Sequence, residues 1–380
     1  MISSGYHLTF LDVQESVINA LNHSDHYTLH ILDNSSSSPS KDESIHNFSG
    51  INSATGGEAP IDAITRAEIV TTSVGPGVLP KVAPLIADGI SKRRLEVVSG
   101  GGGDRKHLTV IACENMVRAS SQLQKHVLEA LEGKEEDLKY FHKHVGFADC
   151  EVDRIVPSYH PDDSDDSGGL SVGVEGFYEW IVEKKNVKSG LEIEGMQLTD
   201  NLDPFLERKL YTLNCGHAIL GFLGYLKGYS SIKQSFNDEE IRGITRGALG
   251  ESGAGLVKKH GFDEKKHEEY IERTMGRYAN PHIDDEVVRV SRNPLRKLSP
   301  GERLVGAVEM CREFALERGN LLKGIAAGFL FYDSGDEEAR NMREIVKDKG
   351  LEGAVAQVTG MEADVKSVVN EYETLKEWKK

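Results

Sequence analysis

Three polar side chains lie close together near the start of a predicted apolar helix. The stretch ERKLYTLNCGHAILGFLGYLKG, residues 207–228, carries Lys209, Asn214 and His217 among Leu, Ile, Phe, Ala and Tyr. With ~100° of rotation per residue, the three side chains fall within one half of the helix surface. Polar groups taken out of water cost free energy unless they are paired. The three residues are therefore either satisfied structural residues or the lining of a cavity that binds a ligand.

An amine, a carboxamide and an imidazole on one helix face suit proton transfer at an alcohol. Oxidation of a secondary alcohol is best served by a base with a pKa near neutrality, and both burial and a helix N-terminus lower the pKa of a lysine. We predict Lys209 as the general base, which becomes the general acid in ketone reduction. Asn214, and Asn115 in ACENM (112–116), would donate amide N–H bonds to the developing alkoxide. His217 would bond a neighbouring hydroxyl.

Each of these residues also has an ordinary structural interpretation. A lone lysine at a helix start usually extends to solvent, and a lone Asn or His in an apolar helix is more often a satisfied core residue. The three residues together, in a chain that also carries ACENM and VDRIVP (152–157), favour the catalytic interpretation.

The elements that must hold these residues change character along the chain. Up to residue 187, short apolar runs such as HLTFLD (7–12) and HLTVIAC (107–113) alternate with helical patterns, which predicts an α/β, Rossmann-like doubly wound sheet. From residue 188, helical patterns dominate. We therefore predict a Rossmann-like NAD-binding domain over 1–187 and a mostly α-helical substrate and catalytic domain over 188–380. Among the predicted elements are a strand at SIHNFSGI (44–51) and helices at 204–228, 231–261 and 336–349.

Strand ends in the first half suggest a dinucleotide site, because cofactors bind at the carboxyl ends of parallel strands. Asp12 ends one strand, where an acid can bond both ribose hydroxyls of NAD and disfavour the extra phosphate of NADP. TTSVGPG (71–77) follows another strand, and its glycines let the backbone approach a bound molecule closely. We predict Ser73, Val74 and Gly75 as cofactor contacts.

The glycine-rich turn that normally opens a dinucleotide fold is not found. Only five residues precede YHLTFLD (6–12), and SGGGGD (99–104) lies between a helix and a strand instead of between a strand and a helix. The first strand and its Gly-rich loop are therefore missing from the pattern, and the predicted sheet lacks a central member. Two explanations stay open: the sequence begins late, or it is a variant that has lost its grip on the cofactor.

Composition argues against several other classes of protein. The net charge of −16 argues against nucleic-acid binding, and no apolar run approaches the ~18 residues of a membrane span. The N-terminus lacks the basic and apolar regions of a signal peptide, so a cytoplasmic protein is expected. The four cysteines form no C-x-x-C pair, which favours reduced thiols. The acidic loop PDDSDDSGG (161–169) is interpreted as a solvated turn, and no metal site is predicted.

Several motifs, in the same order, resemble one family. VGFADCEVDRIVP (145–157) is similar to the signature of the long-chain polyol (mannitol) dehydrogenases, and ERKLYTLNCGHA (207–218) resembles their catalytic K-x-x-x-x-N-x-x-H segment. ACENM resembles the segment with their other catalytic Asn. YANPHIDDEVVRVSRNPLRKL (278–298) resembles their substrate-binding stretch. The resemblance extends over nearly the whole chain.

Within this family the sequence is most similar to the fungal mannitol-1-phosphate 5-dehydrogenases. That resemblance implies an NAD-dependent, metal-independent interconversion of D-mannitol 1-phosphate and D-fructose 6-phosphate. It also implies a monomer whose partner is a small sugar or polyol phosphate, with no nucleic acid and no membrane. The missing Gly-rich opening is the one departure from the family pattern.

The segment SRNPLRKL (291–298) offers a group of cations for an anionic substrate. Arg292 and Arg296 can chelate a phosphate bidentately, and Lys297 adds a point charge. By resemblance, mannitol 2-dehydrogenases carry a glycine- and serine-containing segment here, so the basic segment of this chain favours a phosphorylated substrate. The alternative interpretation is ordinary basic surface that balances an acidic protein. His282 is a further candidate for lining the site.

Two other functions stay open at this point. The chain could be a cofactor-free, inactive paralogue that binds sugar phosphate or a partner protein. It could also be a hexuronate reductase of the same family, since a hexuronate has an anionic end that basic residues could hold.

Overall fold

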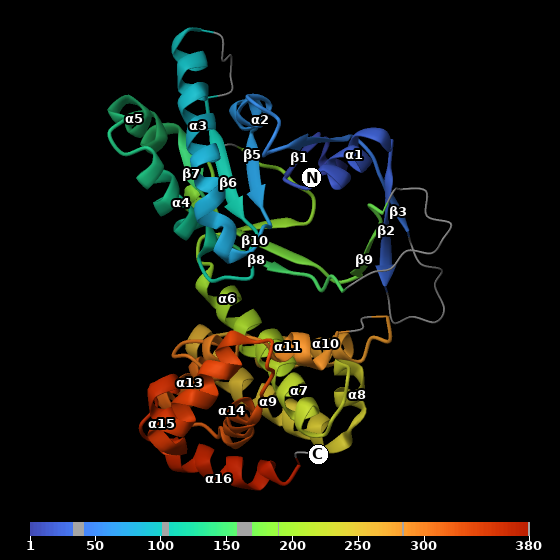
Figure 1. Cartoon of the computed structure of the whole chain (residues 1–380), viewed down its shortest axis with the longest axis vertical. Coiled ribbons are helices and arrows are strands. Elements are labelled where there is room, and N and C mark those ends of the chain that lie inside the picture. The colour runs from blue at the N-terminus through green and yellow to red at the C-terminus, as the bar shows by residue number, and fades with distance from the viewer. Residues whose placement is uncertain (33–41, 101–105, 158–168, 189, 283–284, 379–380) are drawn as a thin grey trace. The chain divides into compact units, whose positions relative to one another are not determined.

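The computed structural model describes residues 1–32, 42–100, 106–157, 169–188, 190–282 and 285–378. The described residues form two compact units, which meet in the chain between Asp203 and Pro204 (Figure 1). The predicted order, a Rossmann-like α/β part followed by a helical part, is confirmed. The acidic loop at 161–168 and most of SGGGGD lie outside the described residues.

The sequence predicts a domain boundary after residue 187, but in the structure the boundary between the units lies after Asp203. The reason is a third strand in one of the sheets. Strand β11 (Met196–Thr199) pairs in parallel with β10 (Glu179–Glu183), which pairs antiparallel with β8 (Cys150–Asp153). The backbone of residues 196–199 is therefore bonded into the first unit.

One parallel sheet of the first unit forms its main layer. Strands β5 (Ile69–Thr72), β6 (Leu108–Ala112) and β7 (Val145–Phe147) run parallel in this order. All five side chains of β6 are buried, as expected for the central strand of a covered sheet. The remaining helices of this unit are α1 (Glu15–His23), α2 (Ala59–Arg66), α3 (Leu79–Val98), α4 (Ala119–Ala130), α5 (Glu135–His144) and three short 3₁₀ turns at Ile2–Ser4, Pro76–Val78 and Lys184–Asn186.

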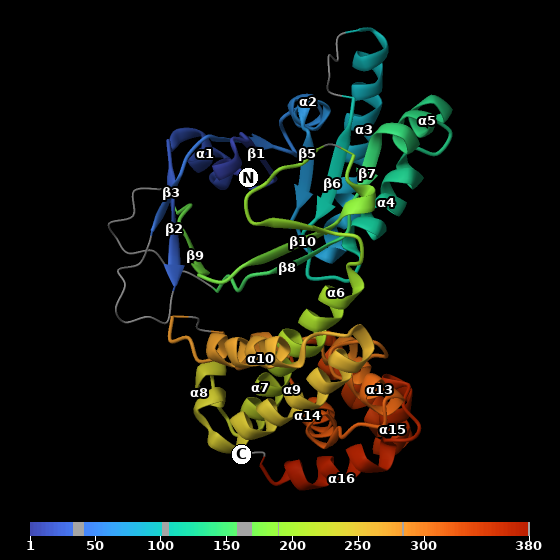
Figure 2. The ribbon, with the colours of Figure 1, turned by 180° about the vertical axis from the view of Figure 1, so that it is seen from behind.

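The predicted gap in the central sheet is visible in the strand pairing. Strand β1 (Leu8–Asp12) pairs in parallel with β4 (Phe48–Asn52), and within the described residues it has no other strand neighbour. Strand β5 likewise pairs only with β6 in the described part of the chain. The strands β1 and β5 therefore belong to different sheets, and each has an edge without a partner strand among the described residues (Figure 2).

The predicted strand at SIHNFSGI is wrong, because it forms two strands in two sheets. Strand β3 (Glu43–Ile45) pairs antiparallel with β2 (Tyr27–Leu32), whereas β4 pairs with β1. Between them Asn47 has a φ of 63°, a left-handed conformation that ends an extended run. The other neighbour of β2 is β9 (Val172–Glu175), which runs parallel to it.

The second unit is helical, with α7 packed against α8, α9, α11 and α14 (Figure 1). Its helices are α6 (Asp203–Lys209), a π-helical turn (Leu210–Asn214), α7 (Cys215–Leu226), α8 (Ile232–Asn237), α9 (Glu239–His260), α10 (Glu264–Tyr278), α11 (Val287–Ser291), α12 (Pro294–Lys297), α13 (Val305–Glu313), α14 (Gly319–Leu330), α15 (Glu337–Thr359) and α16 (Val365–Lys376).

Two predicted helices of this unit have different ends from those expected. The predicted helix 231–261 is divided, because the carboxylate of Asp238 accepts hydrogen bonds from the N–H groups of Glu240 and Ile241 and so starts α9 afresh. The predicted helix 336–349 is too short. Helix α15 continues to Thr359 across a kink at Gly350, whose φ of 71° only glycine adopts readily.

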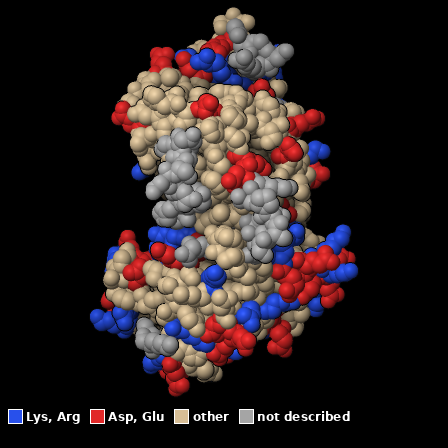
Figure 3. Space-filling view, turned by 90° about the vertical axis from the view of Figure 1, so that its right-hand side faces the viewer, with Lys and Arg blue, Asp and Glu red and all other residues tan. Residues whose placement is uncertain are grey.

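Surface and thiol chemistry agree with the composition. On the face shown in Figure 3, acidic and basic side chains are interspersed, so the described part of this face carries no extended basic patch. None of the helices in the described part of the chain combines the length and apolar character that a membrane span requires. All four cysteines are free thiols.

Candidate functional site

A π-helical turn lies in the middle of the predicted catalytic segment. Helix α6 ends at Lys209, the π-turn occupies Leu210–Asn214, and α7 begins at Cys215. A π-turn bonds i to i+5, so each residue rotates by less than the ~100° of an α-helix. Asn214 and His217 are therefore turned back towards the side of the helix on which Lys209 lies. The sequence predicts an uninterrupted α-helix here and misses this turn.

The burial of the helix answers why it carries polar residues at these positions. From Tyr211 to Leu220, every residue is buried except Asn214 and His217. Lys209, before the turn, is also partly exposed. Asn214 and His217 thus occupy the accessible positions of an otherwise buried stretch, and Lys209 lies in the partly exposed segment before it, so the polar groups of all three can meet a ligand or solvent.

His217 is held by an aromatic ring and a buried carboxylate. Its ring stacks on Tyr278, with centroids 5.7 Å apart, and its Nε2 lies 3.2 Å from Oδ2 of Asp285. Burial, and the positive charges of Arg289 and Lys297, lower the pKa of His217 well below its ordinary value. A neutral ring with its proton on Nε2, the atom beside Asp285, has Nδ1 as its acceptor.

Positive charge is concentrated around this imidazole. Arg289 forms an ion pair with Asp285, and the charges that lower the pKa of His217 are those of Arg289, Lys297, Arg303 and Arg277. Sequence reasoning missed Arg289 and Arg303. Arg289 precedes Arg292 by three residues, one helical turn, and that spacing was a signal for it.

The three cations predicted for the phosphate have different surroundings. The side chains of Arg292 and Arg296 are exposed. Lys297 is buried, and its Nζ donates to the backbone carbonyls of Val290, at 2.7 Å, and Arg292. Burial lowers the pKa of Lys297 to about 7, with a further contribution from Arg303. Lys297 therefore joins α11 to α12, and Arg292 and Arg296 are the cations of this segment with accessible guanidinium groups.

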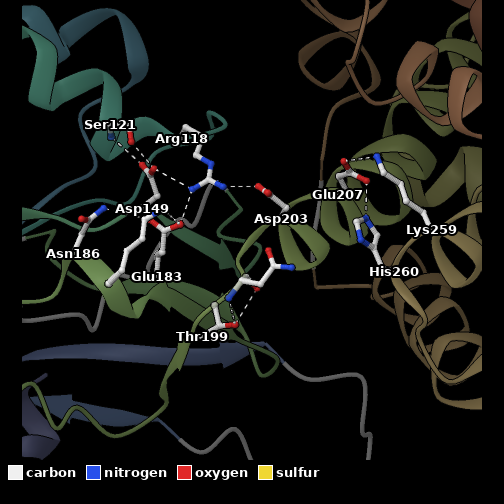
Figure 4. Close-up of polar contacts among 12 residues, drawn as sticks. Arg118, Ser121, Asp149, Glu183, Asn186, Thr199, Asp203, Glu207, Lys259 and His260 are labelled. Atoms are coloured by element: carbon white, nitrogen blue, oxygen red, sulfur yellow. Dashed lines mark hydrogen bonds and ion pairs between the residues drawn. The ribbon is translucent and has the colours of Figure 1, made fainter.

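The two residues before Lys209 anchor its helix to the corner between α9 and α10. The carboxylate of Glu207 lies 2.8 Å from Nζ of Lys259 and 2.7 Å from Nε2 of His260 (Figure 4). The guanidinium of Arg208 lies 4.5 Å from the ring centroid of Tyr270. Consecutive helical residues differ by ~100°, so a helix that points Glu207 and Arg208 at this corner must point Lys209 away from it.

In the first unit, two predicted site segments follow neighbouring parallel strands. Ser73–Gly75 follow β5 and Asn115 follows β6, and the N–H of Cys113 donates to the carbonyl of Thr72 at 2.8 Å. The ends of the two strands are therefore joined, and both segments lie at the same edge of the sheet. The side chain of Asn115 is exposed.

Glu114, which sequence reasoning missed although it lies in ACENM, binds the loop after β5. Its carboxylate accepts hydrogen bonds from the Thr72 hydroxyl at 2.8 Å and from the backbone N–H groups of Val74 and Gly75 at 2.9 and 2.8 Å. These are the N–H groups expected to face a cofactor. The only signal for Glu114 in the sequence was an acid at a strand end.

Arg118 ties together the segment that follows Asn115. Its guanidinium lies 2.9 Å from Glu183 and 3.4 Å from Asp149, and it also pairs with Asp203 (Figure 4). Asp149 accepts further bonds from the N–H and hydroxyl of Ser121, at 2.9 and 2.6 Å. Arg118 adopts a φ of 57°, which these contacts hold in place.

The described residues fit one part of NAD better than another. Asp12 ends β1, where an acid can bond ribose hydroxyls, and among the described residues only its Oδ1 is engaged by a neighbour, the N–H of Gln14 at 2.8 Å. Within the described residues there is no glycine-rich turn between a strand and a helix N-terminus for the pyrophosphate. No group of side chains that could hold a metal ion is found in the part of the chain that the structure describes.

A Rossmann-like unit followed by a helical unit with Lys, Asn and His on one helix face defines a two-domain dehydrogenase. The chain belongs to the mannitol dehydrogenase family: residues 1–195 match the mannitol dehydrogenase Rossmann domain and residues 201–379 match the mannitol dehydrogenase C-terminal domain. It is therefore a member of a family of polyol oxidoreductases, and the resemblance seen in the sequence is confirmed at the level of the family.

Two solved structures are similar over almost the whole chain. One is the Pseudomonas fluorescens mannitol 2-dehydrogenase in a ternary complex with NAD and D-mannitol, with a TM-score of 0.74 and 19% identity over 98% of this chain and 85% of that one. The other is a D-sorbitol dehydrogenase in substrate-free form, with a TM-score of 0.78 and 16% identity over 98% of this chain and 86% of that one. At these identities the likeness shows the fold.

Proposed function

We propose that this protein is an NAD-dependent mannitol-1-phosphate 5-dehydrogenase, which interconverts D-mannitol 1-phosphate and D-fructose 6-phosphate. The observation that carries the proposal is the concentration of cations around His217 beside the accessible face of α6 and α7. Burial is the main cause of the low pKa of His217, and the cations that lower it further also attract an anionic substrate. A neutral polyol gains nothing from their positive potential, whereas a polyol phosphate does.

Lys209 is the proposed proton acceptor from the substrate hydroxyl and the proton donor in the reverse direction. Asn214 and Asn115 donate amide N–H bonds to the oxygen as it gains negative charge. Loss of one such donor raises the activation barrier by about 3 kcal/mol. His217 accepts a hydrogen bond from a neighbouring hydroxyl at its Nδ1. NAD, when bound, supplies the hydride acceptor, and Asp12 holds its ribose.

Arg292 and Arg296 are the proposed phosphate contacts. Both guanidinium groups are exposed, and they follow α11, which packs against α7. Arginine suits this task because its planar fork can bond two phosphate oxygens at once. Arg289 is less suitable, since its ion pair with Asp285 already engages it.

A second candidate function, a cofactor-free protein that binds sugar phosphate, is favoured by one observation. The carboxylate of Glu114 occupies the N–H groups of Val74 and Gly75, two of the residues expected to contact the cofactor. A negative charge at this edge of the sheet disfavours the approach of a pyrophosphate. This candidate keeps the anion-binding cations and drops the redox step.

The test is a titration of the 380-residue chain with NADH, followed by fluorescence, and an assay of fructose 6-phosphate reduction. Binding and turnover support the proposed function. Binding of fructose 6-phosphate without binding of NADH supports the cofactor-free candidate. Turnover of a hexuronate but not of fructose 6-phosphate identifies a carboxylate, and not a phosphate, as the anionic group of the substrate.

Replacement of the proposed base provides the matched variant for this assay. Lys209→Met keeps the length of the side chain and removes the amine, so kcat is expected to fall by about 10²- to 10⁴-fold. The control is Lys233→Met, at a partly buried lysine on α8, which is expected to keep wild-type kcat. Equal activity of the two variants would exclude Lys209 as the base.

A further inference from the structure

The π-turn between α6 and α7 requires hydrogen-bond donors from outside its own helix. At the end of a π-turn, the backbone hydrogen bonds change from the i→i+5 pattern back to the i→i+4 pattern. One carbonyl is skipped at this change and has no N–H donor within the helix. The turn and the residues after it are buried, from Tyr211 to Leu213 and from Cys215 to Gly216. A buried carbonyl without a partner is costly, so neighbouring elements must supply donors here.

Two hydroxyl groups on two other helices meet the carbonyls of this turn. Ser252, buried on α9, donates from Oγ to the carbonyl of Tyr211 at 2.8 Å, closer than its 3.2 Å to Leu249 on its own helix. Tyr278, the last residue of α10, donates from Oη to the carbonyl of Leu213 at 2.6 Å. Both acceptors lie within Leu210–Asn214.

Tyr278 also contacts the residues that follow the turn. Its ring stacks on His217. A Cβ built on Gly216 would lie 2.8 Å from its Oη, so only glycine at this position allows the hydroxyl to reach the helix backbone. One side chain therefore fixes the carbonyl of the turn and the imidazole beyond it.

We propose that Ser252 and Tyr278 are positioning residues that hold the π-turn open, and thereby set the angle between Lys209 and the pair Asn214 and His217. The inference rests on the proposed function. Without the two donors, the turn relaxes towards an ordinary α-helix, and Asn214 and His217 rotate away from Lys209. The proposed base and the proposed amide donor then no longer face the same oxygen.

The experiment compares Tyr278→Phe and Ser252→Ala with two matched controls. Tyr225→Phe removes a tyrosine hydroxyl on α7 that donates to the carbonyl of Tyr332 at 2.7 Å, and Thr245→Val removes a buried hydroxyl on α9 that donates within its own helix at 2.9 Å. All four variants lose one hydroxyl bonded to a backbone carbonyl. Only the first two lose a bond to the π-turn.

Expected results follow from the loss of alignment. In Tyr278→Phe and Ser252→Ala, kcat for fructose 6-phosphate reduction falls about tenfold or more, while KM changes less than about threefold. The controls lose a similar amount of thermal stability but keep wild-type kcat. Hydrogen–deuterium exchange of amides 210–217 becomes faster in the first two variants and is unchanged in the controls.

The proposal is overturned if Tyr278→Phe and Ser252→Ala keep wild-type kcat and exchange rates, or if Tyr225→Phe loses as much activity as they do. A wild-type chain without dehydrogenase activity removes the proposed function but leaves the exchange comparison valid. Unchanged exchange at 210–217 in both variants then overturns the role of the hydroxyls independently.

Discussion

Two histidines of the helical unit show how surroundings decide the protonation of a residue. His217 lies beside Asp285 and is kept neutral by burial and by surrounding cations. His267 is 4% exposed and stacks on Phe262 and Tyr270, with centroids 5.7 and 6.0 Å apart. Burial and Arg208 lower the pKa of His267 to about 4, and its Nε2 has no hydrogen-bond partner within the described residues.

The low pKa of His267 makes stability depend on pH. The unfolded chain takes up this proton near pH 6.5 and the folded chain only near pH 4, so His267 leaves stability unaffected above pH 6.5 and reduces it as the pH falls towards 4. His267→Phe keeps the stacking and cannot be protonated. In urea unfolding, the loss of stability between pH 7 and pH 4.5 should be smaller than in the wild type by about 2 to 3 kcal/mol.

The matched control for this prediction is His282→Phe, at an exposed histidine of the same unit. Because an exposed ring is hydrated in both states, this variant should retain the wild-type dependence on pH. If His267→Phe loses as much stability on acidification as the wild type, His267 is not the group responsible.

At the scale of the element, glycine determines how closely α7 approaches α10. Gly216 lies after the π-turn and faces Tyr278, and added atoms there would also approach Leu249, at 3.3 Å. Gly243, on α9, has open space where a Cβ would be. A larger residue would therefore clash at Gly216 but would fit without contact at Gly243.

Substitution by alanine should separate these two roles. Gly216→Ala forces Tyr278 away and should lower the free energy of unfolding by about 1 to 3 kcal/mol, because it overfills a packed site. Gly243→Ala should raise it by roughly 0.5 to 1 kcal/mol, because alanine favours the helix. The measurement is chemical denaturation of both variants. Similar effects in both would contradict the packing at Gly216.

Two elements differ from what the local sequence pattern predicts. The helical period of 207–228 predicts a helix with Lys209, Asn214 and His217 on one face, and the structure contains it. The π-turn inside it is set by donors on α9 and α10, which no local pattern describes. In the first unit, the left-handed backbone conformation of Asn47 divides one predicted strand into β3 and β4, which belong to two different sheets.

At the scale of the whole molecule, the first unit depends on buried charge as well as on its core. The guanidinium of Arg118 binds Asp149 and Glu183, whose side chains are 1% and 4% exposed, and also Asp203 at the end of this unit. The contacts join the segment after β6, the strand β10 and the start of α6. Their separation along the chain makes Arg118 important for the unit as a whole.

Removal of Arg118 should destabilise the first unit strongly. Arg118→Met leaves the buried carboxylate of Asp149 without the cation beside it and leaves Glu183 with Lys185 alone, which costs about 3 to 5 kcal/mol. The control is Lys139→Met, which removes one side of an exposed ion pair with Glu136 on α5 and should leave stability nearly unchanged, because solvent screens such a pair. Thermal unfolding of the two variants decides the comparison. Equal losses would mean that the buried carboxylates have other compensation.

The sequence alone determined the class of fold, the family, and the helical character of the segment that carries Lys209, Asn214 and His217, because periodicity and motif spacing are local properties of the chain. The roles of the individual site residues stay predictions. Only the tertiary structure decided that Asp285 orients His217, that Glu114 occupies the loop after β5, and that Lys297 bonds backbone carbonyls. The first two of these contacts join residues far apart in the sequence, and the first and third involve the buried side chains of Asp285 and Lys297, whose burial only the packed chain creates.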